Sequence, residues 1–219
     1  MKITPYTLLF LILALSVGCS TNENSKNLSP PISSRLSLYD AAKLVSEKKY
    51  KQAIPTLTQY ALNGNAKAQH LLAILYKDGL GVTKNYTLAH FWFEKAANQN
   101  NASALNDLGN MYALGRGRKK NTEIAFKFYS KSAMLGNGLG QYNVAHAYYF
   151  GDGVKRNHKL AFKYYLMSAK KNISHAQNDL GLLYERGEGV PKNLSKAKFW
   201  LLKAANQGHL GAKKTLRGL

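Results

Sequence analysis

The chain has 219 residues and a formal net charge of +20 at pH 7, which bears on solubility and partners rather than on fold. Its single cysteine, Cys19, excludes an internal disulfide, so packing must stabilise the fold. Lysine and arginine number 31 against 11 aspartates and glutamates, which leaves few candidates for a catalytic pair of carboxylates.

Residues 1–18 predict a secretory signal peptide, because an apolar run at 8–15 is shorter than the roughly 20 residues of a membrane span. The run ends in LSVGC at 15–19, which resembles the lipobox of bacterial lipoproteins. The resemblance implies that Cys19 is acylated and that the protein is an exported, periplasmic lipoprotein. Ser20 rather than Asp follows the cysteine, which favours anchoring in the outer membrane. The alternative is an ordinary signal peptide with a chance cysteine near its cleavage site.

Three further segments flank the central part of the chain. Residues 19–36 are polar and interrupted by proline, and they predict a flexible tether that follows the acylated cysteine. Residues 37–64 predict a degenerate tetratricopeptide-like repeat of two helices, which caps the N-terminal end. Residues 209–219 predict a single C-terminal capping helix rich in lysine.

The central part repeats one 36-residue pattern four times without an insertion or deletion. The copies are residues 65–100, 101–136, 137–172 and 173–208. A fixed period of this size is typical of a solenoid in which each supersecondary unit stacks on the next. The predicted fold is therefore all-α, a right-handed α-solenoid of stacked helix-turn-helix repeats with about eleven helices and no strands.

The equivalent positions of the four copies have distinct physical roles. A leucine or valine lies four residues before a tyrosine, so both occupy one face of the first helix. Paired glycines are predicted to end that helix, and an asparagine to cap the second helix. An aromatic residue of the second helix is predicted to hold one repeat to the next. The tyrosines are Tyr76, Tyr112, Tyr148 and Tyr184; the asparagines are Asn85, Asn121, Asn157 and Asn193; the aromatic residues are Trp92, Phe128, Tyr164 and Trp200.

The pattern A-x-A-x-x-x-L-G-x-x-Y-x-x-G-x-G-V followed by A-x-x-W-x-x-K-A-A-x-Q-G resembles the Sel1-like repeat, a relative of the tetratricopeptide repeat. The resemblance covers about two-thirds of the chain, and the fourth copy follows it closely. Two departures are clear: asparagine stands where the family usually has aspartate, and Arg118 replaces a valine of the second loop. Cysteine-rich members have been linked to β-lactam hydrolysis, but this chain lacks their cysteine pairs.

The candidate binding surface is the concave groove that first helices line in tetratricopeptide-like arrays. Positions there differ between copies while the packing positions do not, and mixed tyrosine, histidine and asparagine suit recognition of an extended peptide. The alternative is that some of these side chains are only solvated. The candidate groove residues are His70, Ile74, Lys77, Asn106, Asn110, Tyr142, His146, Tyr149, Asn178, Leu182 and Glu185.

Cations recur just before the asparagine cap of each copy and predict a basic ridge along one edge of the solenoid. Such a ridge would attract anionic lipid, lipopolysaccharide phosphates or an acidic protein. The alternative is a merely solvated edge, and nucleic acid is a poor partner for an exported protein. The ridge consists of Lys84, Arg116, Arg118, Lys119, Lys120, Lys155, Arg156, Lys159 and Lys192.

No motif predicts catalysis, a cofactor or a metal site. The six histidines form neither H-x-x-x-H nor H-E-x-x-H, and the G-x-G pairs follow helices rather than strands. The favoured hypothesis is a non-catalytic scaffold at the bacterial cell envelope that binds a protein partner in its groove. The alternatives are an envelope enzyme acting on peptidoglycan or β-lactams, and a protein that binds anionic lipid or lipopolysaccharide through the ridge.

Overall fold

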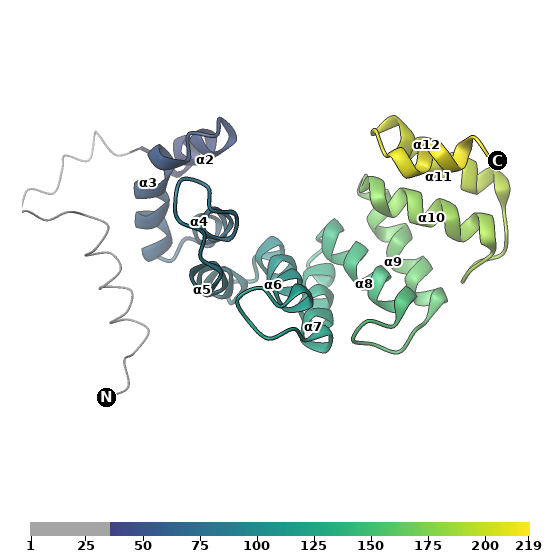
Figure 1. Cartoon of the computed structure of the whole chain (residues 1–219), viewed down its shortest axis with the longest axis horizontal. Helices are drawn as coiled ribbons and strands as arrows, with labels where there is room; N and C mark the ends of the chain where they lie inside the picture. Colours follow the sequence, from purple (N-terminus) through teal and green to yellow (C-terminus); the bar gives the residue numbers. More distant parts are fainter. Residues whose placement is uncertain (1–35) are drawn as a thin grey trace, which may run out of the picture. The chain divides into compact units, whose positions relative to one another are not determined.

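The computed structural model describes residues 36–219, so the predicted signal peptide and Cys19 lie outside the described residues. Within that range the chain forms eleven helices and no strand (Figure 1). The helices are α2 (Leu38–Ser46), α3 (Tyr50–Leu62), α4 (Ala66–Asp78), α5 (Tyr86–Ala97), α6 (Ala102–Leu114), α7 (Thr122–Met134), α8 (Gly138–Phe150), α9 (His158–Lys170), α10 (Ser174–Arg186), α11 (Leu194–Asn206) and α12 (Leu210–Leu216). The predicted all-α solenoid and its helix number are confirmed.

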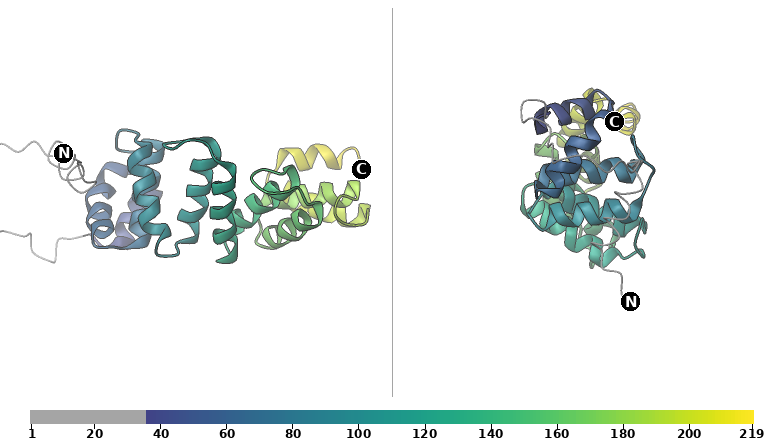
Figure 2. Two further views of the ribbon diagram at one scale, coloured as in Figure 1. Left: turned by 90° about the horizontal axis from the view of Figure 1, so that it is seen from below. Right: turned by 90° about the vertical axis from the view of Figure 1, so that its left-hand side faces the viewer.

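The helices of residues 36–219 form hairpins that follow one another in chain order (Figure 2). Each hairpin packs its two helices together, and its second helix packs on the first helix of the next hairpin. The first helices α4, α6 and α8 lie on the inner side of the curve in Figure 1, and α6 also contacts α8. The inner wall is therefore built from first helices, as tetratricopeptide-like packing predicts.

The two glycines of each interhelix loop have different roles. The first ends the first helix in the left-handed conformation, with φ between 67° and 85° at Gly79, Gly115, Gly151 and Gly187. The second also has a positive φ, but it lies against the start of the preceding repeat's second helix. A Cβ on Gly153 would overlap the carbonyl group of Thr122, and one on Gly189 would overlap that of His158. The prediction that both glycines end the helix is therefore wrong for the second, which allows close contact between repeats.

Asparagine caps the second helices as predicted. In α5, α7, α9 and α11 its side-chain oxygen accepts a hydrogen bond from the backbone N–H three residues later, at 2.8–3.0 Å. The first helices α4, α6 and α8 are capped in the same way by Asn65, Asn101 and Asn137, which the sequence analysis did not assign as caps. Each of these three hairpins therefore has both helix starts fixed by asparagine.

The predicted packing positions form the core. Leu72, Leu108, Val144 and Leu180 are buried, and the small residues beside them are Ala73, Gly109, Ala145 and Gly181. Two of the tyrosines stack on the aromatic residue of the second helix, with ring centroids 5.6 Å apart for Tyr112–Phe128 and 6.0 Å for Tyr148–Tyr164. These stacks join the two helices of one hairpin.

Contact between neighbouring repeats comes from a position two residues earlier, which the sequence analysis did not single out. Phe126 meets Tyr148 of the next repeat edge-on at 5.3 Å, and Phe162 meets Tyr184 at the same distance. His90 occupies the equivalent position against Tyr112, with centroids 5.5 Å apart. Edge-to-face aromatic pairs therefore stabilise the successive repeat boundaries.

Candidate functional site

The inner wall carries hydrogen bonds that link α4 to α6 and α6 to α8. His70 Nε2 lies 2.8 Å from Asp107 Oδ2, and Asn143 Nδ2 donates to Asn106 Oδ1 at 2.8 Å. Both pairs join positions 37 residues apart, so a residue of one repeat meets the following position of the next repeat. These polar contacts fix the spacing of α4, α6 and α8 along the wall.

In the first two repeats, the candidate groove residues are largely occupied by contacts within the fold. Ile74 packs against the core, and Lys77 Nζ lies 3.6 Å from a carboxylate oxygen of Asp78. Asn106 is 5% exposed, and Asn110 accepts a hydrogen bond from the Tyr129 hydroxyl at 2.9 Å. These candidate side chains are therefore held by contacts within the protein.

In the last two repeats, the wall opens into a pocket of about 400 Å³ between α8 and α10. We call this the aromatic pocket; its lining residues are Tyr142, His146, Tyr149, Phe150, Tyr165, Asp179, Leu182, Leu183, Arg186 and Glu188. Four candidate groove residues meet there: Tyr142, His146, Tyr149 and Leu182. Asn178 is buried beside it and donates to Asp179 Oδ1 at 2.9 Å, while Glu185 lies on α10 outside the lining.

Five aromatic rings surround this space. Tyr142 meets Tyr165 edge-on at 5.8 Å, and His146 lies 4.4 Å from Phe150. Tyr149 meets Phe150 edge-on at 4.8 Å. Since α8 contributes four of the rings from positions 142, 146, 149 and 150, its helical spacing alone brings them to one face.

The polar groups of the pocket are held in place by the phenols. The Tyr149 hydroxyl donates a hydrogen bond to Glu188 Oε2 at 2.6 Å. This bond raises the pKa of Tyr149, while the charge of Arg186 acts in the opposite direction. Burial, and then the negative charge of Asp179, raises the pKa of both Tyr142 and Tyr165. Both phenols therefore stay protonated at neutral pH.

A second pocket of about 300 Å³ adjoins the first toward α6 and α7. Tyr142 and His146 line both spaces, and Lys120 and Asp152 are among the other lining residues of the second. The His146 ring nitrogen lies 3.8 Å from an oxygen of Asp152, and its side chain is 44% exposed. Tyr142 and His146 thus form the partition between two neighbouring openings of the inner wall.

Sequence reasoning missed several residues of the aromatic pocket, namely Phe150, Tyr165, Asp179, Leu183, Arg186 and Glu188. Tyr165 belongs to a second helix, and no groove position was assigned to second helices. Asp179 shares its repeat position with Asp107, and both aspartates lie beside a residue 37 positions earlier. A search for polar pairs at that separation would have found Asp179.

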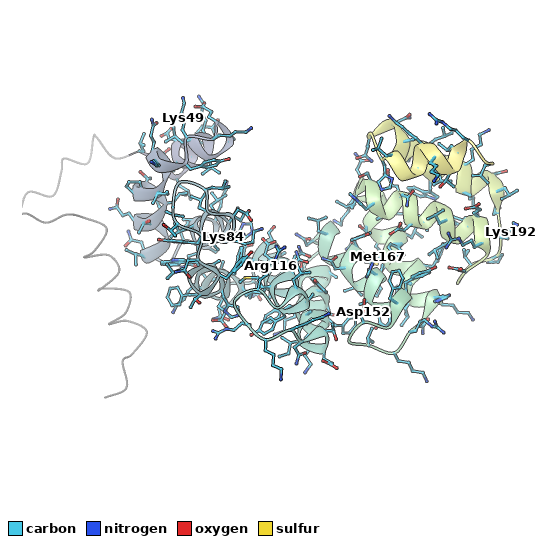
Figure 3. The ribbon with its side chains drawn as sticks, in the orientation of Figure 1. Lys49, Lys84, Arg116, Asp152, Met167 and Lys192 are labelled. Atoms are coloured by element: carbon cyan, nitrogen blue, oxygen red, sulfur yellow. The ribbon has the colours of Figure 1, made fainter. Side chains whose placement is uncertain are left out.

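The predicted ridge residues all lie on the surface. Every one of the nine cations is exposed, and eight of them precede the second helices in the interhelix loops. Figure 3 shows Lys84 and Arg116 on neighbouring repeats and Lys192 at a distance from them, on the fourth repeat. Arg118 is exposed where the equivalent Val82, Val154 and Val190 are half-buried, so the second loop lacks the apolar contact that valine makes.

Two kinds of site have no counterpart in the described part of the chain. Residues 36–219 contain no group of three or more histidine, cysteine or acidic side chains arranged to hold a metal ion. Over the same range no helix has the length and apolar character required to cross a bilayer.

The structure is that of a helical-repeat solenoid with a pocket on its inner wall. The model of the Sel1 repeat family matches residues 66–101, 102–137, 138–173 and 174–209, one residue later than the boundaries drawn from the sequence. The chain therefore belongs to the Sel1 repeat family. Sel1 repeat proteins are generally scaffolds for protein interaction, so the fold is that of a protein-binding module.

Solved structures agree with this assignment. A Sel1 repeat protein from Oxalobacter formigenes is 34% identical with a TM-score of 0.71, over 80% of this chain and 72% of its own. The protective antigen c5321 of uropathogenic Escherichia coli is 28% identical with a TM-score of 0.69, and the alignment covers 80% of this chain but 42% of the antigen. The immunity protein Pa5087 of Pseudomonas aeruginosa is 24% identical with a TM-score of 0.54 and shares the fold. The alignment covers 80% of this chain and 66% of the immunity protein. No curated protein sequence matches significantly.

Proposed function

We propose that this protein is a non-catalytic interaction scaffold of the bacterial cell envelope, and that its partner binds on the inner wall of the last two repeats. The observation that carries the proposal is the aromatic pocket, where rings and charged groups converge on an open space of about 400 Å³. Tyrosine and arginine are enriched among residues that dominate binding energy at protein interfaces. Several candidate groove residues of the first two repeats are instead held by contacts within the fold.

The non-catalytic part of the proposal is supported by the chemistry of the lining. None of the ten lining residues is a serine, threonine, cysteine or lysine, so no such nucleophile faces the pocket. The two carboxylates are held by hydrogen bonds, since Glu188 accepts from Tyr149 and Asp179 accepts from Asn178. Aromatic rings and hydrogen-bonded carboxylates of this kind suit a binding surface, which supports the scaffold proposal.

Removing two exposed rings of the pocket should release the partner. We expect the amount of partner recovered after crosslinking in intact cells to fall at least tenfold in the double variant His146→Ala with Phe150→Ala. The reason is that the partner loses two aromatic contacts. Quantitative mass spectrometry of the purified complex measures the loss. Circular dichroism should show unchanged helicity, since Phe150 is 58% exposed and His146 44%.

The matched control is Phe199→Ala with Leu202→Ala. These α11 side chains are 51% and 43% exposed, so the control removes a similar apolar area away from the pocket. Partner recovery should be unchanged in this variant. Equal recovery from both double variants would contradict binding at the inner wall.

We further propose that the protein is exported and held at the outer membrane by acylated Cys19, which the lipobox-like sequence at 15–19 supports. Replacing Cys19 with alanine should abolish labelling by a radioactive fatty acid and move the protein from the membrane fraction to the soluble fraction. Two or more acyl chains anchor a protein stably, so the shift should be nearly complete. Retention of the label in the variant would rule out Cys19 as the attachment site.

The exposed ridge favours a second role, the orientation of the scaffold against an anionic surface. Each cation near such a bilayer contributes about 1 kcal/mol, and this attraction is screened within a Debye length of about 8 Å at physiological salt. The unacylated Cys19 variant tests this role directly. Salt-sensitive binding to vesicles containing anionic lipid, absent with neutral lipid, would support it, and equal binding to both would exclude it.

A further inference from the structure

We propose that the aromatic pocket binds a cationic side chain, lysine or arginine, presented by the partner protein. This inference deepens the proposed function and rests on it for the source of the side chain. Its own support is the combination of aromatic rings and carboxylates in one space. That combination defines the chemistry of a ligand without identifying the protein that carries it.

The walls of the pocket provide aromatic surfaces for a cation. Tyr142, Tyr149 and Phe150 come from α8, and Tyr165 closes the space from α9. A Lys ammonium or Arg guanidinium is attracted to the face of such rings within about 6 Å of the centroid. The ring contacts described above, between 4.4 and 5.8 Å, hold these walls in a fixed arrangement.

Two carboxylates add full negative charge to those walls. Asp179 is half-buried on α10, close to the phenols of Tyr142 and Tyr165, and Asn178 donates a hydrogen bond to it. Glu188 follows α10 and is held by the Tyr149 hydroxyl at 2.6 Å. Because hydrogen bonds orient both groups before a ligand arrives, binding a cation needs little rearrangement.

The charge of the pocket lining is opposite in sign to the net charge of the protein. The whole chain carries 31 lysines and arginines and 11 acids, yet the pocket lining holds two carboxylates and one guanidinium, that of Arg186. Arg186 is solvent-exposed, and Glu188 lies in the same lining to balance it. The excess of negative charge in the lining favours a cationic ligand over a carboxylate, although the rest of the protein is strongly positive.

The size of the pocket matches one side chain rather than a larger ligand. Its volume of about 400 Å³ lies near the lower limit of small-molecule sites, which span roughly 300–1,000 Å³. The long aliphatic stem of lysine or arginine can cover Leu182 and the rings while its head reaches the carboxylates. The adjoining pocket, across Tyr142 and His146, leaves room for the neighbouring residues of the partner segment.

Three small probes test the charge preference on the purified protein. They are Nα-acetyl-lysine N-methylamide, its Nε-acetylated and therefore neutral form, and Nα-acetyl-glutamate N-methylamide. Backbone amide shifts measured by NMR during titration report binding at α8 and α10. We expect saturable shifts with the lysine probe and about tenfold weaker binding of the neutral probe, because acetylation removes the ammonium charge.

Two variants locate the binding site. Glu188→Gln removes a charge while keeping an oxygen that can accept from Tyr149, and Asp179→Asn removes the second charge. Each substitution should weaken the binding of the lysine probe about tenfold. Asp78→Asn, an exposed acid outside the lining, is the matched control and should bind normally. If Asp179→Asn fails to fold, Glu188→Gln alone decides the outcome.

Equal affinity for the charged and neutral lysine probes would overturn the inference, as would tighter binding of the glutamate probe that depends on Arg186. These results are separable from those for the proposed function. A partner captured at the inner wall without any lysine-probe binding would leave the scaffold function standing and remove the cationic ligand. Lysine-probe binding without partner capture would support the cationic ligand and contradict the scaffold function.

Discussion

Gly153→Ala should lower the free energy of unfolding by about 3 kcal/mol. Gly153 has a φ of +71°, which costs an L-residue about 1 kcal/mol or more, and its new methyl group would overlap the Thr122 carbonyl at the start of α7. Overpacking of this kind costs roughly 1–3 kcal/mol because backbone has to move. Urea denaturation followed by circular dichroism at 222 nm measures the change.

Gly64→Ala is the matched control for Gly153→Ala. Gly64 has a φ of +87°, but a Cβ there would meet nothing within 4 Å. The control therefore isolates the conformational cost of the left-handed backbone, about 1 kcal/mol. If the two variants lose equal stability, the contact between the loop and the preceding repeat contributes nothing, and the role given to the second glycines is wrong.

His90→Phe should raise the free energy of unfolding by about 1 kcal/mol at pH 7. His90 is 1% exposed, its Nε2 has no hydrogen-bond partner, and its Nδ1 lies 3.4 Å from a Glu94 carboxylate oxygen. A buried polar group left unsatisfied costs roughly 1–3 kcal/mol. The equivalent residues Phe126 and Phe162 make the same edge-on contact with the next tyrosine, so phenylalanine fits this position.

The gain from His90→Phe should grow as the pH falls. Burial lowers the pKa of His90 below its ordinary value of 6.5, although Glu94 acts in the opposite direction. Below about pH 6.5 the unfolded chain binds a proton that the folded chain does not, so the stability present above that pH is lost as the pH falls toward the lowered folded-state pKa. Phenylalanine removes this loss.

Urea denaturation of both proteins between pH 8 and pH 5 measures this difference. His209, whose pKa is also lowered by burial, is present in both and contributes equally to their remaining pH dependence. Stability curves that run parallel over the whole range would contradict the assignment to His90.

The repeat pattern was sufficient to predict the fold because its main determinants are local. A glycine with a positive φ at a helix end and an asparagine at a helix start act within a few residues, as Gly115 and Asn121 show. The leucine and tyrosine positions lie on one face of one helix, so their burial follows from helical spacing alone. The second glycine was misassigned because its reason is a contact with the previous repeat, which no local pattern reveals.

The binding wall was predicted only in part for the same physical reason. Tyr142, His146 and Tyr149 share a helix, and their spacing brings them together in the aromatic pocket. Tyr165 and Glu188 reach the pocket from a second helix and from a loop, so their positions depend on how hairpins stack. The sequence also could not show which candidate groove residues are free to bind a ligand. Ile74 packs against the core and Asn106 accepts a hydrogen bond from the next repeat, and both contacts depend on how the hairpins stack.

The pairing of residues 37 positions apart has a consequence for how new specificity can arise in such a chain. His70 of one unit meets Asp107 of its successor, and Tyr142 lies beside Asp179, whose charge raises the tyrosine pKa. Exchanging one unit for a unit of another protein would remove one member of each pair at the boundaries of that unit. Chimeras cut at 172/173 should therefore lose ligand preference even when both parents fold, and inheritance of a recognition surface requires two adjacent units together.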